Sequence, residues 1–244
     1  MKNRFFKASL FLIMTGLVLS GCVMNRVSLE KEAIVLRQDG GGRIIRLDLE
    51  TGDAWSRKMQ AGPLVFNVLS QVVIWTEDGE GRLLETVYVS GADYTKMRNA
   101  AKKEKGEQFF RESFPLWARK MSEAGRRLPS PESPYTDAVT SATPSNDFSL
   151  ETKLEQTSPP FSIIAEINTA GDENDTFTKD RNGWVGQPAL IYTARVTGQD
   201  AGYLLELAGH SGLLDQEAAL YTDLSAFDSA LRQVKQIKLV ITSD

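Results

Sequence analysis

The feature that most constrains the fold is a set of short segments in which apolar and polar side chains alternate. Successive side chains of a β-strand point to opposite faces of a sheet, so this spacing predicts strands with one buried face. The clearest segment is Phe161 to Ile167, with Phe161, Ile163, Ala165 and Ile167 on one face and Ser162, Ile164 and Glu166 on the other. Further β-rich segments span residues 43–49, 64–69, 72–75, 82–90, 148–154, 189–197, 203–208 and 234–242. Many short strands predict a mainly β fold, an antiparallel immunoglobulin-like β-sandwich.

Glycine-rich turns separate two pairs of these segments. Gly40, Gly41 and Gly42 lie between residues 33–37 and 43–49, which predicts an N-terminal β-hairpin over residues 33–62, ahead of a sandwich domain over residues 63–244. A second predicted hairpin joins residues 72–75 to 82–90. Residues 46–52 also look like one blade strand of a β-propeller, but a propeller needs several copies and we find no second one.

One segment has helical spacing. Apolar residues recur at i, i+3, i+4 and i+7 as Phe114, Trp117, Ala118 and Met121. Pro115 suits a first helical turn and Gly125 suits a C-terminal stop. The pattern predicts a short helix that caps the core, with Trp117 in a packing role.

Residues 1–21 have the pattern of an export signal. Lys2, Arg4 and Lys7 precede a mostly apolar run, residues 8–19, that is too short to span a bilayer stably as a helix. Leu19-Ser20-Gly21-Cys22 then resembles the lipobox of bacterial lipoproteins. In that family the cysteine thiol receives a diacylglyceryl group, the signal is cut before the cysteine, and the new amine is usually acylated, with palmitate among the chains expected.

The lipobox resemblance implies a lipid anchor at Cys22 and a polar tether over residues 22–32. Two or more acyl chains hold a protein firmly at a membrane, whereas one holds it only marginally. The implied location is the periplasmic side of the bacterial cell envelope. Val23 stands where an aspartate tends to retain lipoproteins of Gram-negative bacteria at the inner membrane, which favours the outer membrane. The alternatives are an ordinary cleaved signal with an incidental cysteine and an N-terminal membrane helix.

Composition excludes several classes of site and partner. Cys22 is the only cysteine, so no disulfide forms within the chain, and the single histidine excludes the usual zinc sites. A net charge of −4 and a pI near 5.3, without a basic stripe, argue against nucleic acid as a partner.

Several pieces between residues 75 and 240 together resemble a family of bacterial predicted periplasmic proteins of unknown function. The matching pieces are residues 83–89, 114–117, 137–144, 166–168, 172, 174–175 and 186–192. The resemblance implies an exported β-sandwich, often encoded near membrane proteins of redox or metal metabolism. It implies no established reaction.

Residues 137–143 also resemble the Asp-x-x-Ser/Thr-Gly-Ala-Thr signature of proteins that carry covalent FMN. The resemblance implies attachment of FMN to Thr143 by a periplasmic transferase, with Asp137 in recognition or in the turn and Thr140 at the signature's Ser/Thr position. Ser141 replaces the usual glycine, and serine reaches some glycine backbone angles only at a cost. The alternative is a structural loop in which Asp137 and Thr140 bind local backbone.

A loop over residues 168–186 is rich in side-chain oxygens. Hard cations such as Ca²⁺ take six to eight oxygen ligands, and Asn168, Asp172, Asn174 and Asp175 could supply several. The spacing is not that of an EF-hand. A solvated acidic loop is the alternative, and we favour it because such loops are common.

No catalytic constellation is evident. A Ser/His/Asp hydrolase would need His210 near a serine and an acid in space, and no Gly-x-Ser-x-Gly elbow is present. We interpret His210, in Gly209-His210-Ser211-Gly212, as a turn residue. The sequence therefore favours a non-enzymatic, lipid-anchored protein that binds or assists an envelope protein partner. The alternative is a flavinylated electron carrier with FMN on Thr143.

Overall fold

The structure, a computed structural model, describes residues 31–36, 42–90, 100–129, 139–141, 143–155, 157–198 and 201–242. The chain divides into two compact units, Met1–Glu30 and Lys31–Asp244, and every described residue belongs to the second unit. The predicted signal and Cys22 lie outside the described residues.

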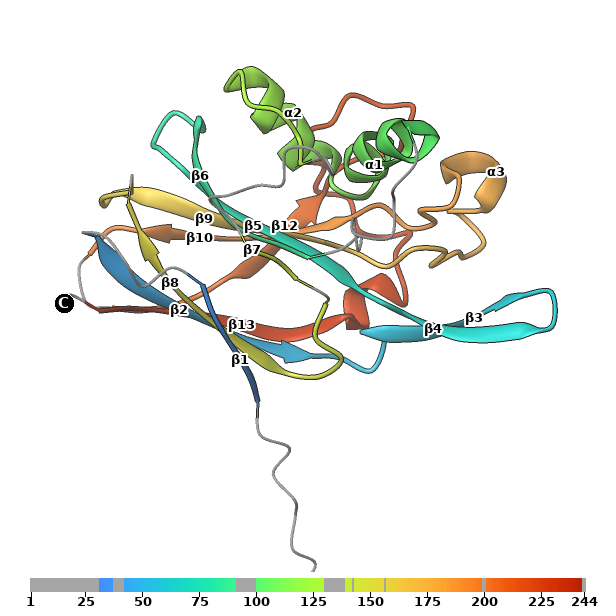
Figure 1. Ribbon diagram of the computed structural model, residues 1–244, viewed down its shortest axis with the longest axis horizontal. Helices are drawn as coiled ribbons and strands as arrows, with labels where there is room; N and C mark the ends of the chain where they lie inside the picture. Colours follow the sequence, from blue (N-terminus) through green and yellow to red (C-terminus); the bar gives the residue numbers. More distant parts are fainter. Residues whose placement is uncertain are drawn as a thin grey trace, which may run out of the picture. The chain divides into compact units, whose positions relative to one another are not determined.

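Two sheets form the body of this second unit (Figure 1). The five-stranded sheet has the order β1 (Glu32–Val35), β8 (Phe148–Leu154), β2 (Arg43–Thr51), β13 (Val234–Thr242) and β11 (Gly202–Leu204). The six-stranded sheet has the order β12 (Glu206–His210), β10 (Leu190–Val196), β9 (Phe161–Asn168), β5 (Gln71–Glu77), β6 (Leu83–Ser90) and β7 (Val139–Ser141). Most neighbours are antiparallel, while β1–β8 and β6–β7 are parallel.

The apolar core lies between the two sheets. Ile45, Leu47 and Leu49 of β2 pack in one cluster with residues of β8 and β13 and with the inward face of the six-stranded sheet. The alternation predicted for residues 161–167 is confirmed, because its apolar face lies in this core and Glu166 lies on the opposite face. The predicted β-sandwich is confirmed.

Two helices cover the outer face of the six-stranded sheet, as Figure 1 shows. They are α1 (Ala100–Ser113) and α2 (Pro115–Glu123). α2 confirms the predicted capping helix, with Trp117 and Met121 fully buried. A second apolar cluster lies between these helices and the sheet. Trp75 and Val73 of β5 point into it, so β5 is buried on both faces. No helix among the described residues is long and apolar enough to cross a membrane.

Two of the strands predicted from the sequence are assigned wrongly, one in its partner and one in its extent. β1 and β2 do not form the hairpin predicted over residues 33–62, because β8 lies between them and pairs with both. Apolar alternation identifies a strand but does not fix its partner, and β2 is a central strand of the sandwich. The segment 203–208 is also not one strand. It divides between β11, in the five-stranded sheet, and β12, in the six-stranded sheet.

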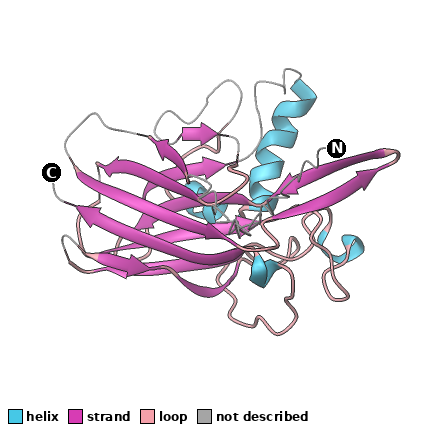
Figure 2. Ribbon diagram, turned by 90° about the horizontal axis from the view of Figure 1, so that it is seen from below, coloured by secondary structure: helices cyan, strands magenta, loops and turns pink. Residues whose placement is uncertain are grey.

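The remaining elements are short. Helix α3 (Lys179–Asn182) lies in the loop between β9 and β10, and a 3-10 turn, η2 (Ala230–Arg232), precedes β13. Strands β3 (Ser56–Ala61) and β4 (Leu64–Leu69) form a separate two-stranded sheet. Seen from below in Figure 2, this hairpin extends from the side of the sandwich.

Candidate functional site

The β3–β4 hairpin is a separate two-stranded sheet outside the two sheets of the sandwich. Its strands pair in register from Ser56↔Leu69 to Ala61↔Leu64, and Gly62 and Pro63 form the turn. Gly62 has φ +60°, which suits the first central position of a two-residue hairpin turn and which side-chain-bearing residues rarely adopt. Among the described residues neither strand pairs with any strand of the two main sheets.

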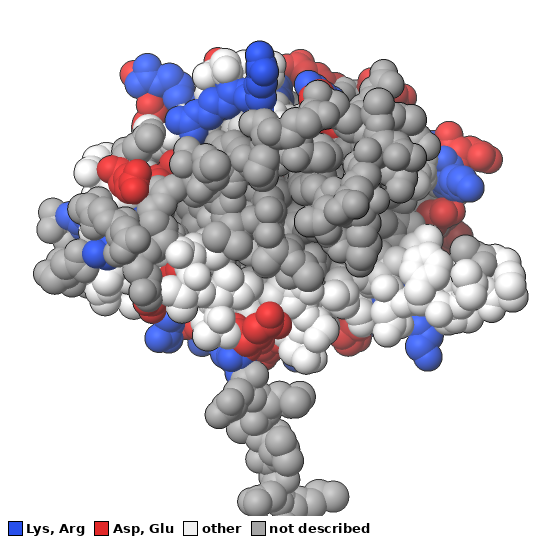
Figure 3. All heavy atoms as spheres, viewed as in Figure 1, with Lys and Arg blue, Asp and Glu red and all other residues white. Residues whose placement is uncertain are grey.

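The tip of this hairpin exposes three consecutive apolar side chains. The exposed fractions are 69% for Leu64, 63% for Val65 and 45% for Phe66. Because consecutive strand residues point to opposite faces, apolar surface lies on both faces of the ribbon. In the space-filling view of Figure 3 the projecting hairpin is mostly uncharged, apart from basic atoms on its underside. A run of exposed apolar residues on a projecting element makes the hairpin tip the candidate contact surface of the described residues.

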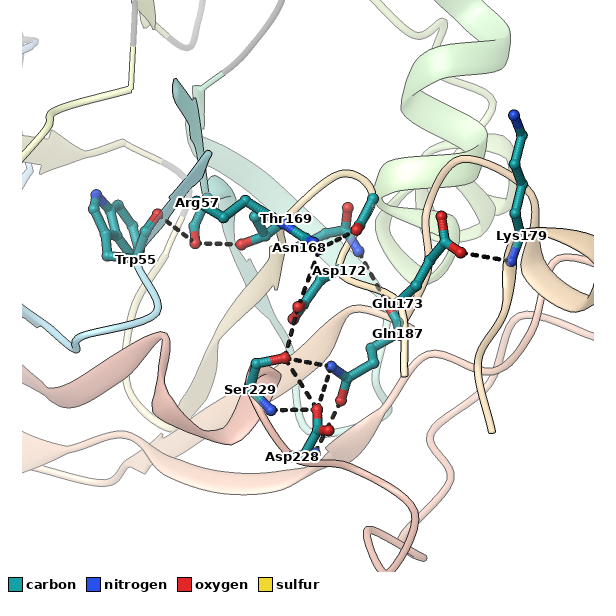
Figure 4. A network of polar contacts seen from close by, with 12 residues as sticks. Trp55, Arg57, Asn168, Thr169, Asp172, Glu173, Lys179, Gln187, Asp228 and Ser229 are labelled. Atoms are coloured by element: carbon teal, nitrogen blue, oxygen red, sulfur yellow. Dashed lines mark hydrogen bonds and ion pairs between the residues drawn. The ribbon is translucent and has the colours of Figure 1, made fainter. Parts of the chain in front are cut away.

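A network of polar contacts holds the base of the hairpin against the body (Figure 4). Arg57 of β3 donates to the Gly171 carbonyl and, over 3.3 Å, to Asp172 Oδ1. Ser229 Oγ donates to the same Asp172 oxygen at 2.6 Å, just before η2. Met59 packs so closely against Gly171 that a Cβ at position 171 would lie only 3.0 Å from the Met59 Cε. The base of the hairpin is therefore fixed, while its tip extends free.

Both ends of the hairpin are also fixed to the sandwich core. The buried Trp55 precedes β3, and its Nε1 donates to the Pro144 carbonyl at 2.8 Å. Ser70 follows β4, and its backbone N–H and hydroxyl both donate to the Trp55 carbonyl, at 2.8 and 2.9 Å. These bonds close the hairpin at its root, so the direction of the ribbon is set by buried groups.

Asp172 is the charged centre of the network. Burial raises the pKa of its carboxyl above the ordinary value of 3.8, opposed by the Ser229 hydroxyl and by the charge of Arg57. Gln187 extends the network, since its Nε2 donates to Asp228 Oδ1 and Ser229 Oγ, both at 2.7 Å. A buried carboxylate held by a partner cation and hydroxyl acts here as a structural anchor.

The residues predicted for calcium do not share one role. Asn174 Oδ1 accepts the backbone N–H groups of Thr176 and Phe177, at 2.9 and 2.8 Å, and so organises its own loop. Asn168 is buried and donates to the Gln187 carbonyl, whereas Asp175 is exposed. No group of three or more His, Cys, Asp or Glu side chains that could hold a metal occurs in the described part of the chain. Calcium binding stays a prediction.

The flavinylation motif is only partly described. Asp137 lies outside the described residues, and Thr140 lies in β7, paired with Val89 of β6. Thr143 is half-buried and precedes Pro144, whose carbonyl accepts the Trp55 bond. Thr140 and Ser141 are thus strand residues at a sheet edge and do not form the turn that the motif suggests. FMN attachment stays a prediction.

His210 is a packed residue and not a free turn residue. It ends β12, and its Nδ1 accepts the Gly212 N–H at 3.1 Å. Its ring lies against Tyr221 and Phe227, with centroids 5.4 and 4.9 Å away. Burial lowers the pKa of His210, opposed by Asp223. These contacts account for the position of the ring.

Glu166 is a buried acid that the sequence did not single out. It projects from β9 to the start of α2, where its carboxylate accepts Leu116 N–H at 3.2 Å and Trp117 N–H at 2.9 Å. Phe114 at the N-cap provides no side-chain hydrogen bond, so a sheet residue satisfies the free amides of the helix. Burial raises the pKa of Glu166 to about 8, opposed by these two N–H groups and the Ser211 hydroxyl.

Comparisons with protein-family models, with curated proteins and with solved structures found no match. The two sequence resemblances described above stay predictions.

Proposed function

We propose that this chain is a lipid-anchored protein of the bacterial cell envelope with a non-enzymatic binding role, and that the β3–β4 hairpin is its contact element. The observation that carries the proposal is the exposed run Leu64, Val65 and Phe66 at the tip of a ribbon whose base is fixed by buried groups. Exposed apolar surface is costly in water, and its burial against a partner is the favourable term in most associations.

The anchor and the hairpin have complementary parts in this proposal. The resemblance to the lipobox supports attachment at Cys22, and the predicted tether of residues 22–32 can reach about 39 Å when extended, at roughly 3.5 Å per residue. A partner in the same membrane would meet the hairpin at a high effective concentration, so a small contact would suffice. The two buried acids Glu166 and Asp172 have structural contacts of their own, with the first turn of α2 and with Ser229, which favours binding over catalysis at these positions.

Three variants test the two halves of the proposal separately. Cys22→Ser should lose palmitate labelling and leave the membrane fraction. Leu64→Ser combined with Phe66→Ser should keep the label but reduce the size of the detergent-extracted complex on native gel filtration. Leu204→Ser, at a side chain that is 51% exposed on β11, is the matched control and should behave as the wild type. A complex of unchanged size in the hairpin variant would refute the binding role of the hairpin.

A further inference from the structure

Among the described residues no further strand pairs with either edge of the hairpin, and the two edges differ in character. β3 carries Arg57 and Lys58, and lysine on an edge strand is a common protection against pairing with other strands. β4, with the sequence Leu-Val-Phe-Asn-Val-Leu, has no charged residue and no proline. An uncharged, apolar edge of this kind is a template for another strand.

The geometry of the turn determines which backbone N–H and C=O groups of β4 point away from β3. In a two-residue hairpin the residues that flank the turn, Ala61 and Leu64, exchange hydrogen bonds with each other. Directly opposite pairs then alternate, so the N–H and C=O groups of Val65 and Asn67 point away from β3. No described backbone group pairs with them, so they are available to a strand alongside β4.

We propose that the strand that pairs with β4 is β4 of a second copy of this chain, in an antiparallel two-fold arrangement. With Phe66 opposite Phe66 of the second copy, Val65 and Asn67 of one copy exchange hydrogen bonds with Asn67 and Val65 of the other. Leu64 then lies opposite Val68, so Leu64, Phe66 and Val68 of both copies fall on one face of a four-stranded sheet, while Val65 and Leu69 fall on the other.

The distribution of charged side chains favours pairing along β4 over pairing along β3. Pairing of β4 with itself brings together no charged side chains, whereas pairing of β3 with itself would place Lys58 and Arg57 beside their own copies. An isolated two-stranded ribbon is marginal in water, and four strands with an apolar face form a more stable unit. The antiparallel direction also places the exposed tip of each hairpin beside the root of the other.

The contact is small. Six strand residues per copy fall well short of the roughly 20–30 residues per side of a standard stable interface, so we expect a weak dimer in free solution. The expectation of a stronger dimer in the cell rests on the proposed lipid anchor, because anchoring in one membrane raises the effective concentration. A solution test of the soluble domain does not depend on that anchor.

Sedimentation equilibrium of residues 31–244, the compact unit that contains every described strand and both described apolar clusters, tests the dimer between micromolar and millimolar concentration. Asn67→Pro removes an outward N–H from the β4 edge, and Lys58→Pro removes its counterpart from the β3 edge. Both positions are exposed and directly opposite each other, so the two variants are matched. We expect Asn67→Pro to weaken dimerisation at least tenfold and Lys58→Pro to leave it within about twofold of the wild type.

Asn67→Lys serves as a second variant, because proline could also perturb the hairpin itself. It keeps the N–H but places a charge beside the paired β4 strands, and it should also weaken the dimer. A wild-type domain that is monomeric at millimolar concentration would overturn the proposal, as would equal effects of Asn67→Pro and Lys58→Pro. A domain that stays monomeric but binds vesicles of phosphatidylethanolamine and phosphatidylglycerol through Phe66 would assign the hairpin to the bilayer instead.

Discussion

Glu166→Gln should change how the stability of the domain depends on pH. Glu166 is fully buried between β9 and the first turn of α2, and burial raises its pKa to about 8 from the ordinary 4.5. Between these two values the folded chain holds a proton that the unfolded chain has released. Stability from this group is therefore complete below pH 4.5 and is lost as the pH rises through 8.

The size of the effect follows from the two pKa values. Each pKa unit corresponds to about 1.4 kcal/mol, so the wild type should lose at most about 5 kcal/mol through this group between pH 4 and pH 9. Glutamine has nearly the same shape but does not titrate. It has one acceptor oxygen for the amides of Leu116 and Trp117, so one N–H loses its partner at a constant cost of about 1–3 kcal/mol.

Urea unfolding of residues 31–244 at a series of pH values measures this directly. The quantity to follow is the free energy of unfolding of the wild type minus that of Glu166→Gln, because contributions from other titrating groups, such as Asp172, cancel in the difference. We expect this difference to fall steadily from pH 4 to pH 9. A difference that is constant with pH, or that rises, would refute the assignment of a raised pKa to Glu166.

Two further predictions concern the cofactor and the metal. If Thr143 carries FMN, coexpression with a periplasmic flavin transferase should add the mass of FMN less one water to the exported protein, and Thr143→Ala should abolish the addition. An unchanged mass would leave Thr143 as a connecting residue between β7 and β8. For calcium, we expect millimolar Ca²⁺ to leave Tm unchanged, because Asn174 Oδ1 and Asp172 Oδ1 already accept hydrogen bonds within the protein. A rise in Tm that Asp172→Asn removes would establish the site instead.

The strands were predictable because alternation is a local property. β9 and β13 match their predicted segments closely, and so does the hairpin of β5 and β6. Partners at long range were not predictable. β1 pairs with β8 across more than a hundred residues, and no turn signal reports such a contact.

The exposed hairpin was not predictable as an interaction site. A strand such as Leu64 to Leu69 has the same composition whether it is buried in a core or free in solvent, and the sequence was interpreted as core. The available signal was the Gly62-Pro63 turn, which closes a two-stranded unit. The basic residues of β3, opposite a strand without charge, were a second signal.

Glu166 was placed on the correct face but its burial was missed. A polar residue on the outer face of a strand normally faces water, and no motif or spacing distinguishes Glu166 from such a residue. Its outer-face neighbours Ile164 and Trp75 are apolar, which is the mark of a face covered by another layer. The buried acid is then explained by its two helical N–H partners.

Site-specific photocrosslinking in intact cells tests the central claim most directly. A photoreactive amino acid would replace Val65 at the hairpin tip and, as a control, Leu204 on the β11 strand. The account predicts a discrete crosslinked product from position 65, of twice the monomer mass if the hairpin pairs with a second copy, and none from position 204. A crosslink from position 65 to a different protein would keep the binding role and reject the dimer. Absence of any product from position 65, with the protein correctly located, would contradict the claim that the hairpin is the contact element.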